Sequence, residues 1–221
     1  MARERVVIFG NRDTAQLAHF YLKHDSDYEV VAFALDREFR TDESFEGLPL
    51  VDFEEVERLF SPADHRMFVP MTHRKMGATR TAKYLAAKSK GYGLISYVSS
   101  HATVFPGAPI GENCFILEDN TIQPFTKIGN NVVLWSGNHI GHHGEIRDHA
   151  FFTSHVVMSG HVSIGEYSFL GVNATIRDAV TLAHHTLVGM GAVISKDTEA
   201  FGVYTSPASK AWADKKSTDV M

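Results

Sequence analysis

The sequence predicts a fold in two parts, an α/β domain with a small parallel sheet followed by an all-β parallel helix built from hexapeptide repeats. Up to residue 97, short apolar runs alternate with helix-like stretches, which is typical of a parallel sheet covered by helices. From residue 98 onward, an apolar residue recurs at every sixth position. We therefore expect an α/β domain over 1–97, a β-helix over 98–200 and a C-terminal tail over 201–221.

Four apolar runs and three amphipathic stretches make up the first part. The expected strands are VVIFG (6–10), YEVVAFALD (28–36), RMFVPM (66–71) and YGLISYV (92–98). The expected helices are TAQLAHFYLKH (14–24), FEEVERLF (53–60) and RKMGATRTAKYLAAKSKG (74–91), the last with a lysine-rich end followed by glycine. Because strand and helix alternate, we expect a small Rossmann-like parallel α/β domain.

The hexad is the strongest signal in the second part. The series runs in steps of six from Val98 to Ile194, and all seventeen positions are apolar, which excludes chance. Two residues earlier the side chain is usually small, as at Ala108, Cys114 and Ala150. Since residues two apart in a strand face the same side, each short strand would point one large and one small side chain inward. A repeat of this length matches the hexapeptide signature of a parallel β-helix.

Composition limits the functions that fit the chain. The formal charge is −5, and no sustained basic run is present, which argues against nucleic acid as the main partner. The sequence lacks an apolar segment near 18 residues and a secretory pattern at its start, so we expect no membrane partner and a cytoplasmic location. The single cysteine, Cys114, excludes an internal disulfide and is expected in the core.

The stretch NHIGHH (138–143) contains three histidines with different expected roles. Three residues after each inward position the chain must turn a corner, and left-handed corner geometry favours Gly, Asn, Asp and His. His143 lies at such a corner, as do His101, His149, His155, His161 and His185. His142 precedes the corner, where geometry requires no special residue, so it is the better catalytic candidate. His139 should point outward, as a surface or interface residue.

The motifs IGENCF, IGNNVV, IGHHGE, IGEYSF and LGVNAT resemble those of the hexapeptide acyltransferases. The resemblance implies a left-handed triangular β-helix with eighteen residues to a coil and five to six coils. Over nearly the whole chain the sequence is similar to the sugar acyltransferases of the NeuD and PglD type, which acetylate nucleotide-linked amino sugars in bacterial surface glycan synthesis. This resemblance implies acetyl-CoA as co-substrate and a homotrimer.

The resemblance also implies the residues of the acyl-transfer site. In the family, the general base lies in an I-x-H hexad followed closely by IG, which maps onto IGHHGEIR and selects His142. Many members follow the base with a glutamate that orients it; here His143 stands in that place, and Glu145 and Asp148 are further candidates for the orienting group. The expected acetyl-CoA contacts are Phe151, Val172, Met190 and the amide of Gly160, the last as donor to the developing oxyanion.

The nucleotide sugar is expected between the α/β domain and the β-helix. Family members carry a sequence similar to GAxGHG after the first strand. This chain has GNRDTA there, which keeps Gly10, adds Asn11 and Arg12, and loses the later glycines. Arg12 can contact a phosphate. Asp36 and Arg37 match the region that meets the nucleotide base, and Arg74 aligns after the fourth strand.

Other readings of the same residues remain open. Some left-handed β-helices are carbonic anhydrases with three zinc-binding histidines, but the matching positions here are Arg147 and Pro106, so no metal is expected. The expected function is N-acetylation of a nucleotide-linked amino sugar. The alternatives are O-acetylation of a sugar hydroxyl and a non-catalytic β-helix scaffold or sugar sensor.

Overall fold

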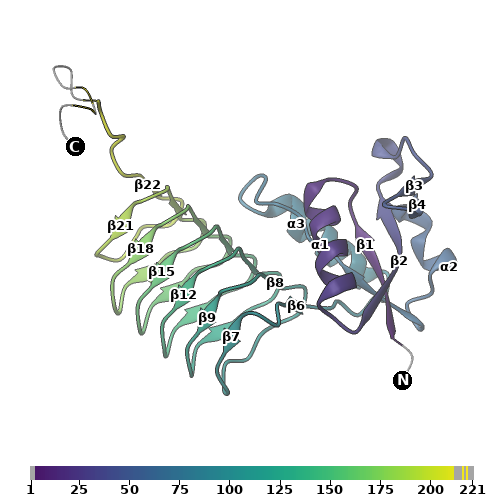
Figure 1. Cartoon of the computed structure of the whole chain (residues 1–221), viewed down its shortest axis with the longest axis horizontal. Helices are drawn as coiled ribbons and strands as arrows, with labels where there is room; N and C mark the ends of the chain where they lie inside the picture. Colours follow the sequence, from purple (N-terminus) through teal and green to yellow (C-terminus); the bar gives the residue numbers. More distant parts are fainter. Residues whose placement is uncertain (1–2, 212–215, 217, 219–221) are drawn as a thin grey trace.

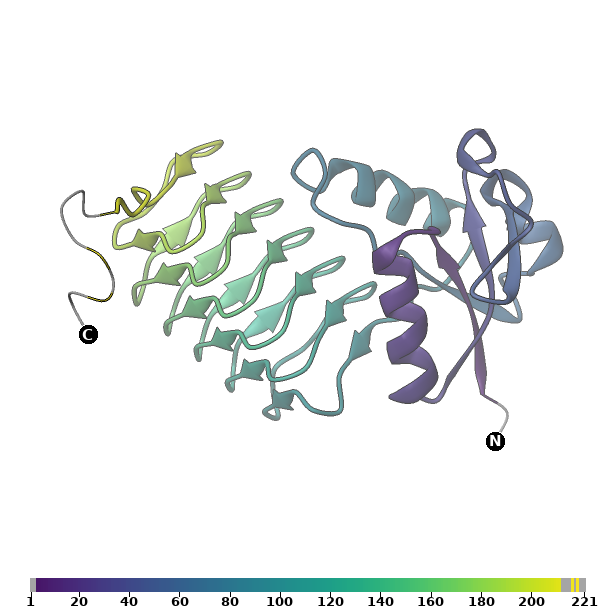
Figure 2. The same cartoon turned by 45° about the horizontal axis from the view of Figure 1, so that its top comes forward.

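The computed structural model describes residues 3–211, 216 and 218. The α/β domain lies beside one end of a long parallel β-helix, and the chain leaves the β-helix at its opposite end (Figures 1 and 2). The predicted fold class is confirmed in both parts. None of the helices in the described residues is long and apolar enough to cross a membrane.

The α/β domain contains one five-stranded sheet. Its strands are β1 (Glu4–Phe9), β2 (Tyr28–Leu35), β3 (Ser44–Phe45), β4 (Leu48–Asp52) and β5 (His65–Phe68), in the order β3-β4-β2-β1-β5. All pairs are parallel except β3 with β4. The helices are α1 (Asp13–His24), α2 (Val56–Leu59) and α3 (Ala78–Ser89), with two 3₁₀ segments, η1 (Arg37–Phe39) and η2 (Phe53–Glu55).

Three elements of this domain differ from expectation. The β3–β4 hairpin was not predicted, because its strands are too short to show a period. α3 begins at Ala78 and not at residue 74, because Lys75, Met76 and Gly77 all have positive φ, which helical backbone excludes. The run 92–98 forms only an isolated bridge between Leu94 and Met67 before it enters the β-helix.

The β-helix has three faces, which we call the first, second and third sheet. The first sheet holds β6 (Tyr97–Val98), β8 (Phe115–Ile116), β11 (Val133–Leu134), β14 (Phe151–Phe152), β17 (Phe169–Leu170), β20 (Leu187–Val188) and β22 (Val203–Tyr204). The second holds β7 (Thr103–Val104), β9 (Thr121–Ile122), β12 (His139–Ile140), β15 (Val157–Met158), β18 (Thr175–Ile176) and β21 (Val193–Ile194). The third holds β10 (Lys127–Ile128), β13 (Glu145–Ile146), β16 (Ser163–Ile164) and β19 (Thr181–Leu182).

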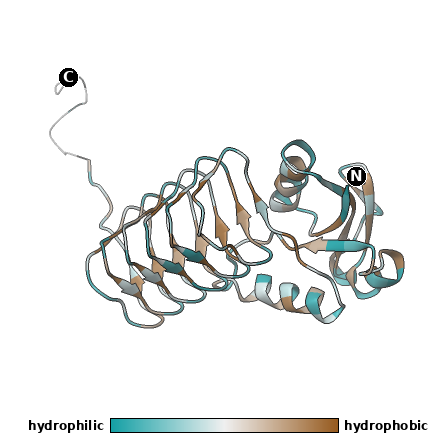
Figure 3. Ribbon diagram, turned by 90° about the horizontal axis from the view of Figure 1, so that it is seen from below, coloured by the Kyte–Doolittle hydropathy of each residue, from teal (hydrophilic) through white to brown (hydrophobic). Residues whose placement is uncertain are grey.

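Strands pair with a register of eighteen residues, as when His139 pairs with Val157, except in the last pair, where Leu187 pairs with Val203. The inward positions of the hexad form one continuous core from Cys114 to Ile194, and apolar residues gather on the strands of the β-helix (Figure 3). β22 pairs with β20, so the segment predicted as a tail, 201–221, adds a strand to the first sheet. Its residues 212–215, 217 and 219–221 lie outside the described part of the chain.

The corners have the expected left-handed geometry, and residues of other types adopt it as well. We call the edge between the first and second sheets edge 1, that between the second and third edge 2, and that between the third and first edge 3. Phe125, Tyr167 and Ala179 have positive φ at their corners, although their side chains do not favour it. The repeat therefore imposes the conformation on whatever residue stands there. His101, a predicted corner, is an exception without positive φ in the terminal coil.

The two parts share a core and a set of polar contacts. One face of the five-stranded sheet, with α1, packs on Phe115, Val133 and Phe151 of the first sheet. The other face is covered by residues of η2, α2 and α3. Arg80 of α3 is fully buried and donates to the carbonyls of Asn131 at 3.1 Å and His149 at 2.8 Å. Burial lowers the pKa of Arg80 to about 10.

Candidate active site

His142 lies two residues after the end of β12 on edge 2, with its side chain exposed. Its backbone N–H donates to Oε1 of Gln123 at 3.0 Å. Its Nδ1 lies 3.1 Å from Nδ1 of His143, and the two rings meet at 86°. His143 has φ 54°, and this left-handed corner places two consecutive imidazoles within hydrogen-bonding distance of each other.

A third imidazole completes the group. His161 occupies the next corner of edge 2, and its backbone N–H donates to the carbonyl of His142 at 2.9 Å. Its ring stacks on that of His143 at 5.1 Å and 16°, and meets that of His142 edge to face at 5.2 Å. Phe125 contacts the other side of His143 at 4.7 Å between ring centres. Sequence reasoning missed His161 as a partner, although its spacing of one coil from His143 was visible.

Gly160 lies against the ring of His142. A Cβ at this position would stand 2.7 Å from Cε1 and 2.9 Å from Nε2 of His142, so any larger residue would displace the imidazole. The amide of Gly160 donates to no acceptor within the described residues. A free backbone donor therefore lies close to Nε2 of the candidate base.

The two carboxylates considered as orienting groups are engaged elsewhere. Glu145 pairs with Arg147 at 3.2 Å, and Asp148 accepts the backbone N–H of Asn130 at 2.7 Å. Within the described residues, the hydrogen-bond partner of the His142 ring is His143.

The residues expected to contact acetyl-CoA do not come together in one chain. Val172 and Met190 lie on consecutive coils beside edge 1, and are 41% and 74% exposed. Gly160 lies beside edge 2. Phe151 is 5% exposed, because His73, Arg80 and Phe169 cover its ring. Its expected contact with acetyl-CoA stays a prediction, and the structure places it under the α/β domain.

A pocket at the carboxyl ends of β1 and β2 collects five of the six residues expected to bind the nucleotide sugar. Its lining includes Gly10, Asn11, Arg12, Asp36 and Arg74. Gly10 has φ 119°, which its lack of a side chain permits. Arg12 immediately precedes α1, so the amino end of that helix faces the pocket. Their role in binding stays a prediction.

Arg37 does not line this pocket. It pairs with Asp52 at 2.7 Å and Glu55 at 3.3 Å, and its side chain is 58% exposed. The structure adds Lys83 of α3, which pairs with Asp36, and the exposed ring of Phe39. Sequence reasoning missed Lys83 because only the packing of α3 on the sheet brings it to β2.

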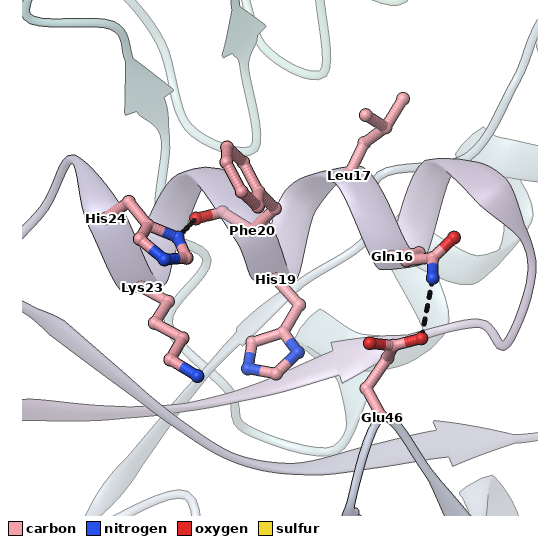
Figure 4. A pocket seen from close by; sticks show the side chains of 7 residues that line it. All are labelled: Gln16, Leu17, His19, Phe20, Lys23, His24 and Glu46. Carbon is pink, nitrogen blue, oxygen red and sulfur yellow. Dashed lines mark hydrogen bonds between the residues drawn. The ribbon is translucent and has the colours of Figure 1, made fainter.

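A second surface pocket lies along α1, beside the β3–β4 turn (Figure 4). Its lining comprises Gln16, Leu17, His19, Phe20, Lys23, His24 and Glu46, and it contains none of the expected site residues. Gln16 donates to Glu46 at 2.7 Å, which ties α1 to the β3–β4 turn.

Comparison with known proteins identifies the repeat and the fold. Residues 108–142 match the family model described as bacterial transferase hexapeptide (six repeats). No curated protein matches the sequence. The chain has the fold of the hexapeptide-repeat acyltransferases. Its β-helix is accordingly left-handed, as the resemblance implied.

Solved structures match over nearly the whole chain. A histidine-to-asparagine variant of perosamine N-acetyltransferase from Caulobacter crescentus, in complex with CoA and GDP-perosamine, is 23% identical, with a TM-score of 0.82 over 91% of this chain and 93% of that one. The acetyltransferase domain of PglB from Neisseria gonorrhoeae, in complex with acetyl coenzyme A, is 22% identical, with a TM-score of 0.82 over 92% and 96%. WeeI from Acinetobacter baumannii is 17% identical, with a TM-score of 0.74 over 90% and 94%.

Proposed function

We propose that this protein is an acetyl-CoA-dependent N-acetyltransferase that acts on a nucleotide-linked amino deoxysugar in bacterial surface glycan synthesis. The observation that carries the proposal is the exposed imidazole of His142 beside the unpaired amide of Gly160. This pair lies in a fold shared with a perosamine N-acetyltransferase that binds CoA and GDP-perosamine.

In the proposed mechanism, His142 is the general base. When Nδ1–H of His142 donates to Nδ1 of His143, the lone pair of Nε2 is free to take a proton. The sugar amine attacks the thioester carbonyl as it loses that proton to Nε2. The tetrahedral oxyanion accepts a hydrogen bond from the amide of Gly160. The C–S bond then breaks, and the CoA thiolate leaves and takes the proton from His142.

The arrangement of the edges favours an assembly of at least two copies. Val172 and Met190 lie beside edge 1, whereas His142 and Gly160 lie beside edge 2, and the second sheet separates the two edges. A site that combines the expected pantetheine contacts with the base needs edge 1 of one copy against edge 2 of another. We therefore include a homotrimer in the proposal.

The pocket of the α/β domain suits a nucleotide diphosphate. Arg12 and Arg74 are exposed cations, and the amino end of α1 favours an anion. Asp36 offers a carboxylate acceptor and Phe39 an exposed ring, the groups that hydrogen-bond and stack with a nucleobase. Because acetyl-CoA and nucleotide sugars are cytoplasmic metabolites, the proposed location is the cytoplasm.

The first test is thiol release from acetyl-CoA across UDP-, GDP- and dTDP-linked 3-amino and 4-amino deoxysugars, with the matching hydroxy sugars beside them. Release confined to an amino sugar is expected. Release only with hydroxy sugars would replace N-acetylation by O-acetylation. A protein that binds no acyl-CoA and releases no thiol would instead be the non-catalytic scaffold.

A further inference from the structure

From the three imidazoles on edge 2 we infer a binding site for one divalent transition metal ion of the zinc class, which inhibits the enzyme reversibly when it is occupied. The site consists of His142, His143 and His161. One ring nitrogen of each can be chosen so that all three lie within 4.8 Å of one another. The site differs from the arrangement that Arg147 and Pro106 made unsuitable.

The distances fit tetrahedral coordination. Zinc binds imidazole nitrogen at about 2.0–2.1 Å, which places two ligand nitrogens about 3.3 Å apart in a tetrahedron. The Nδ1 atoms of His142 and His143 already lie 3.1 Å apart. The ring of His161 stacks on that of His143, so it must rotate out of this contact to share one ion, and the exposure of all three rings leaves room for that rotation. Water would fill the fourth position.

The backbone holds the three histidine positions close together. His143 and His161 stand at consecutive corners with φ 54° and 57°, and the hydrogen bond from His161 N to the carbonyl of His142 joins the coils. The backbone therefore brings three imidazoles together before the metal arrives, which lowers the entropic cost of binding it.

The chain contains a matched arrangement that lacks the third ligand. His184 and His185 repeat the pair geometry, with Nδ1 atoms 3.1 Å apart and rings at 87°. Their neighbours on adjacent coils are Tyr167 and Phe201, which offer no imidazole. The two-histidine site should therefore bind zinc much more weakly than the three-histidine site.

Occupation of the site removes the base in either binding mode. A metal on Nε2 of His142 takes the lone pair that would accept the substrate proton. A metal on Nδ1 leaves the remaining ring proton on Nε2, and the base is again absent. This inhibitory consequence depends on the proposed function, whereas the metal site itself does not.

The test uses the full chain, freed of any affinity tag and stripped with EDTA. Calorimetric titration with ZnCl₂ is expected to show one tight site per chain, and Co²⁺ should give the visible absorption of tetrahedral coordination. His161→Asn removes one ligand, and asparagine suits the left-handed corner, as Asn131 and Asn173 show. This variant should lose zinc affinity by about tenfold or more, whereas His185→Asn, the matched corner control, should bind zinc like the wild type.

Inhibition is measured as thiol release with and without zinc. Zinc should abolish wild-type activity, EDTA should restore it, and the activity that His161→Asn retains should become insensitive to the same zinc concentration. The metal site would be overturned if zinc did not bind stoichiometrically, or if His161→Asn and His185→Asn bound zinc with equal affinity. Bound zinc that leaves activity unchanged, or raises it, would overturn the inhibition. Specific zinc binding in a protein that acetylates no sugar would instead count against the proposed function.

Discussion

The Nδ1 atoms of His142 and His143 lie 3.1 Å apart, so the hydrogen-bond partner of the candidate base is an imidazole and not a carboxylate. A carboxylate in that place would stabilise the imidazolium that forms during catalysis, and a neutral acceptor does so less. The pair can nevertheless fix the ring and its tautomer, because one nitrogen must donate and the other accept.

Replacement of His142 by alanine should remove the base and leave the fold intact. Because general base catalysis contributes about 10²–10⁴ in rate, kcat should fall by that factor, while the Kd for acetyl-CoA should stay near the wild-type value. Steady-state kinetics and calorimetry measure the two quantities. Near-normal turnover would remove His142 from the role.

Replacement of His143 by asparagine tests orientation of the base. Asparagine tolerates the corner, but it cannot hold the ring of His142 as the imidazole does, so kcat should fall by about 100-fold with little change in KM. His185→Asn, a corner variant on edge 3 with the same pair geometry, serves as the control for backbone effects. If both variants lost rate equally, the cause would be the change in corner backbone and not the loss of the contact between His142 and His143.

Replacement of Arg12 by methionine should weaken binding of the nucleotide sugar. A hydrogen bond to a charged group contributes about 1.5–3 kcal/mol, so KM for the nucleotide sugar should rise by about tenfold or more, while KM for acetyl-CoA should not change. Lys23→Met, in the second pocket on α1, removes a surface cation without this effect. If KM for the nucleotide sugar rose equally in Arg12→Met and Lys23→Met, the effect would come from the loss of surface charge in general and not from a contact of Arg12.

Replacement of Arg80 by methionine should destabilise the junction between the two parts. It leaves the carbonyls of Asn131 and His149 without their buried donor, at a cost of about 3 kcal/mol. Chemical denaturation should show this loss. Arg58→Met is the control: its side chain is 79% exposed, and the change should stay within about 0.5 kcal/mol. A small effect at Arg80 would mean that water replaces the lost donor.

Asp25 should make stability depend on pH. Its hydrogen bonds with Ser100 and Tyr97 lower its pKa to about 2. Since the unfolded chain then binds the proton more strongly, the stabilisation is present above about pH 4 and is lost as the pH falls toward 2. Asp25→Asn should melt about 4 °C below the wild type at pH 7, and the difference should shrink toward pH 2.

The matched variant for Asp25 is Asp27→Asn, which removes an exposed carboxylate two residues away. Its melting temperature should follow that of the wild type at every pH. A gap between wild type and Asp25→Asn that stays constant from pH 7 to pH 2 would show that packing, and not the charge, sets the difference.

The hexad made the β-helix predictable because its signal repeats at every coil, from Val98 to Ile194. The β3–β4 hairpin has no such repetition, and its short strands form only because β2 presents an open edge. Lys83 shows the same limit for the site. Its helix was expected, but its contact with Asp36 arises from the packing of α3 on the sheet, which no local pattern encodes.

His161 was missed for a different reason. A period of eighteen residues places it next to His143, so the sequence contained the information, but corner geometry alone was a sufficient explanation for a histidine there. Likewise, counting hexads assigns Val172 and Met190 to edge 1 and His142 to edge 2, so the sequence also contained their separation within one chain.

The period of eighteen also governs how the chain tolerates changes in length. Six extra residues placed before His142 would keep every inward position apolar, yet they would carry the base from edge 2 to another edge. Only a whole added coil restores the orientation, and it displaces everything beyond it by one strand spacing of about 4.8 Å. Insertions and deletions that preserve activity should therefore occur in the repeat in multiples of eighteen residues, which adds or removes whole coils.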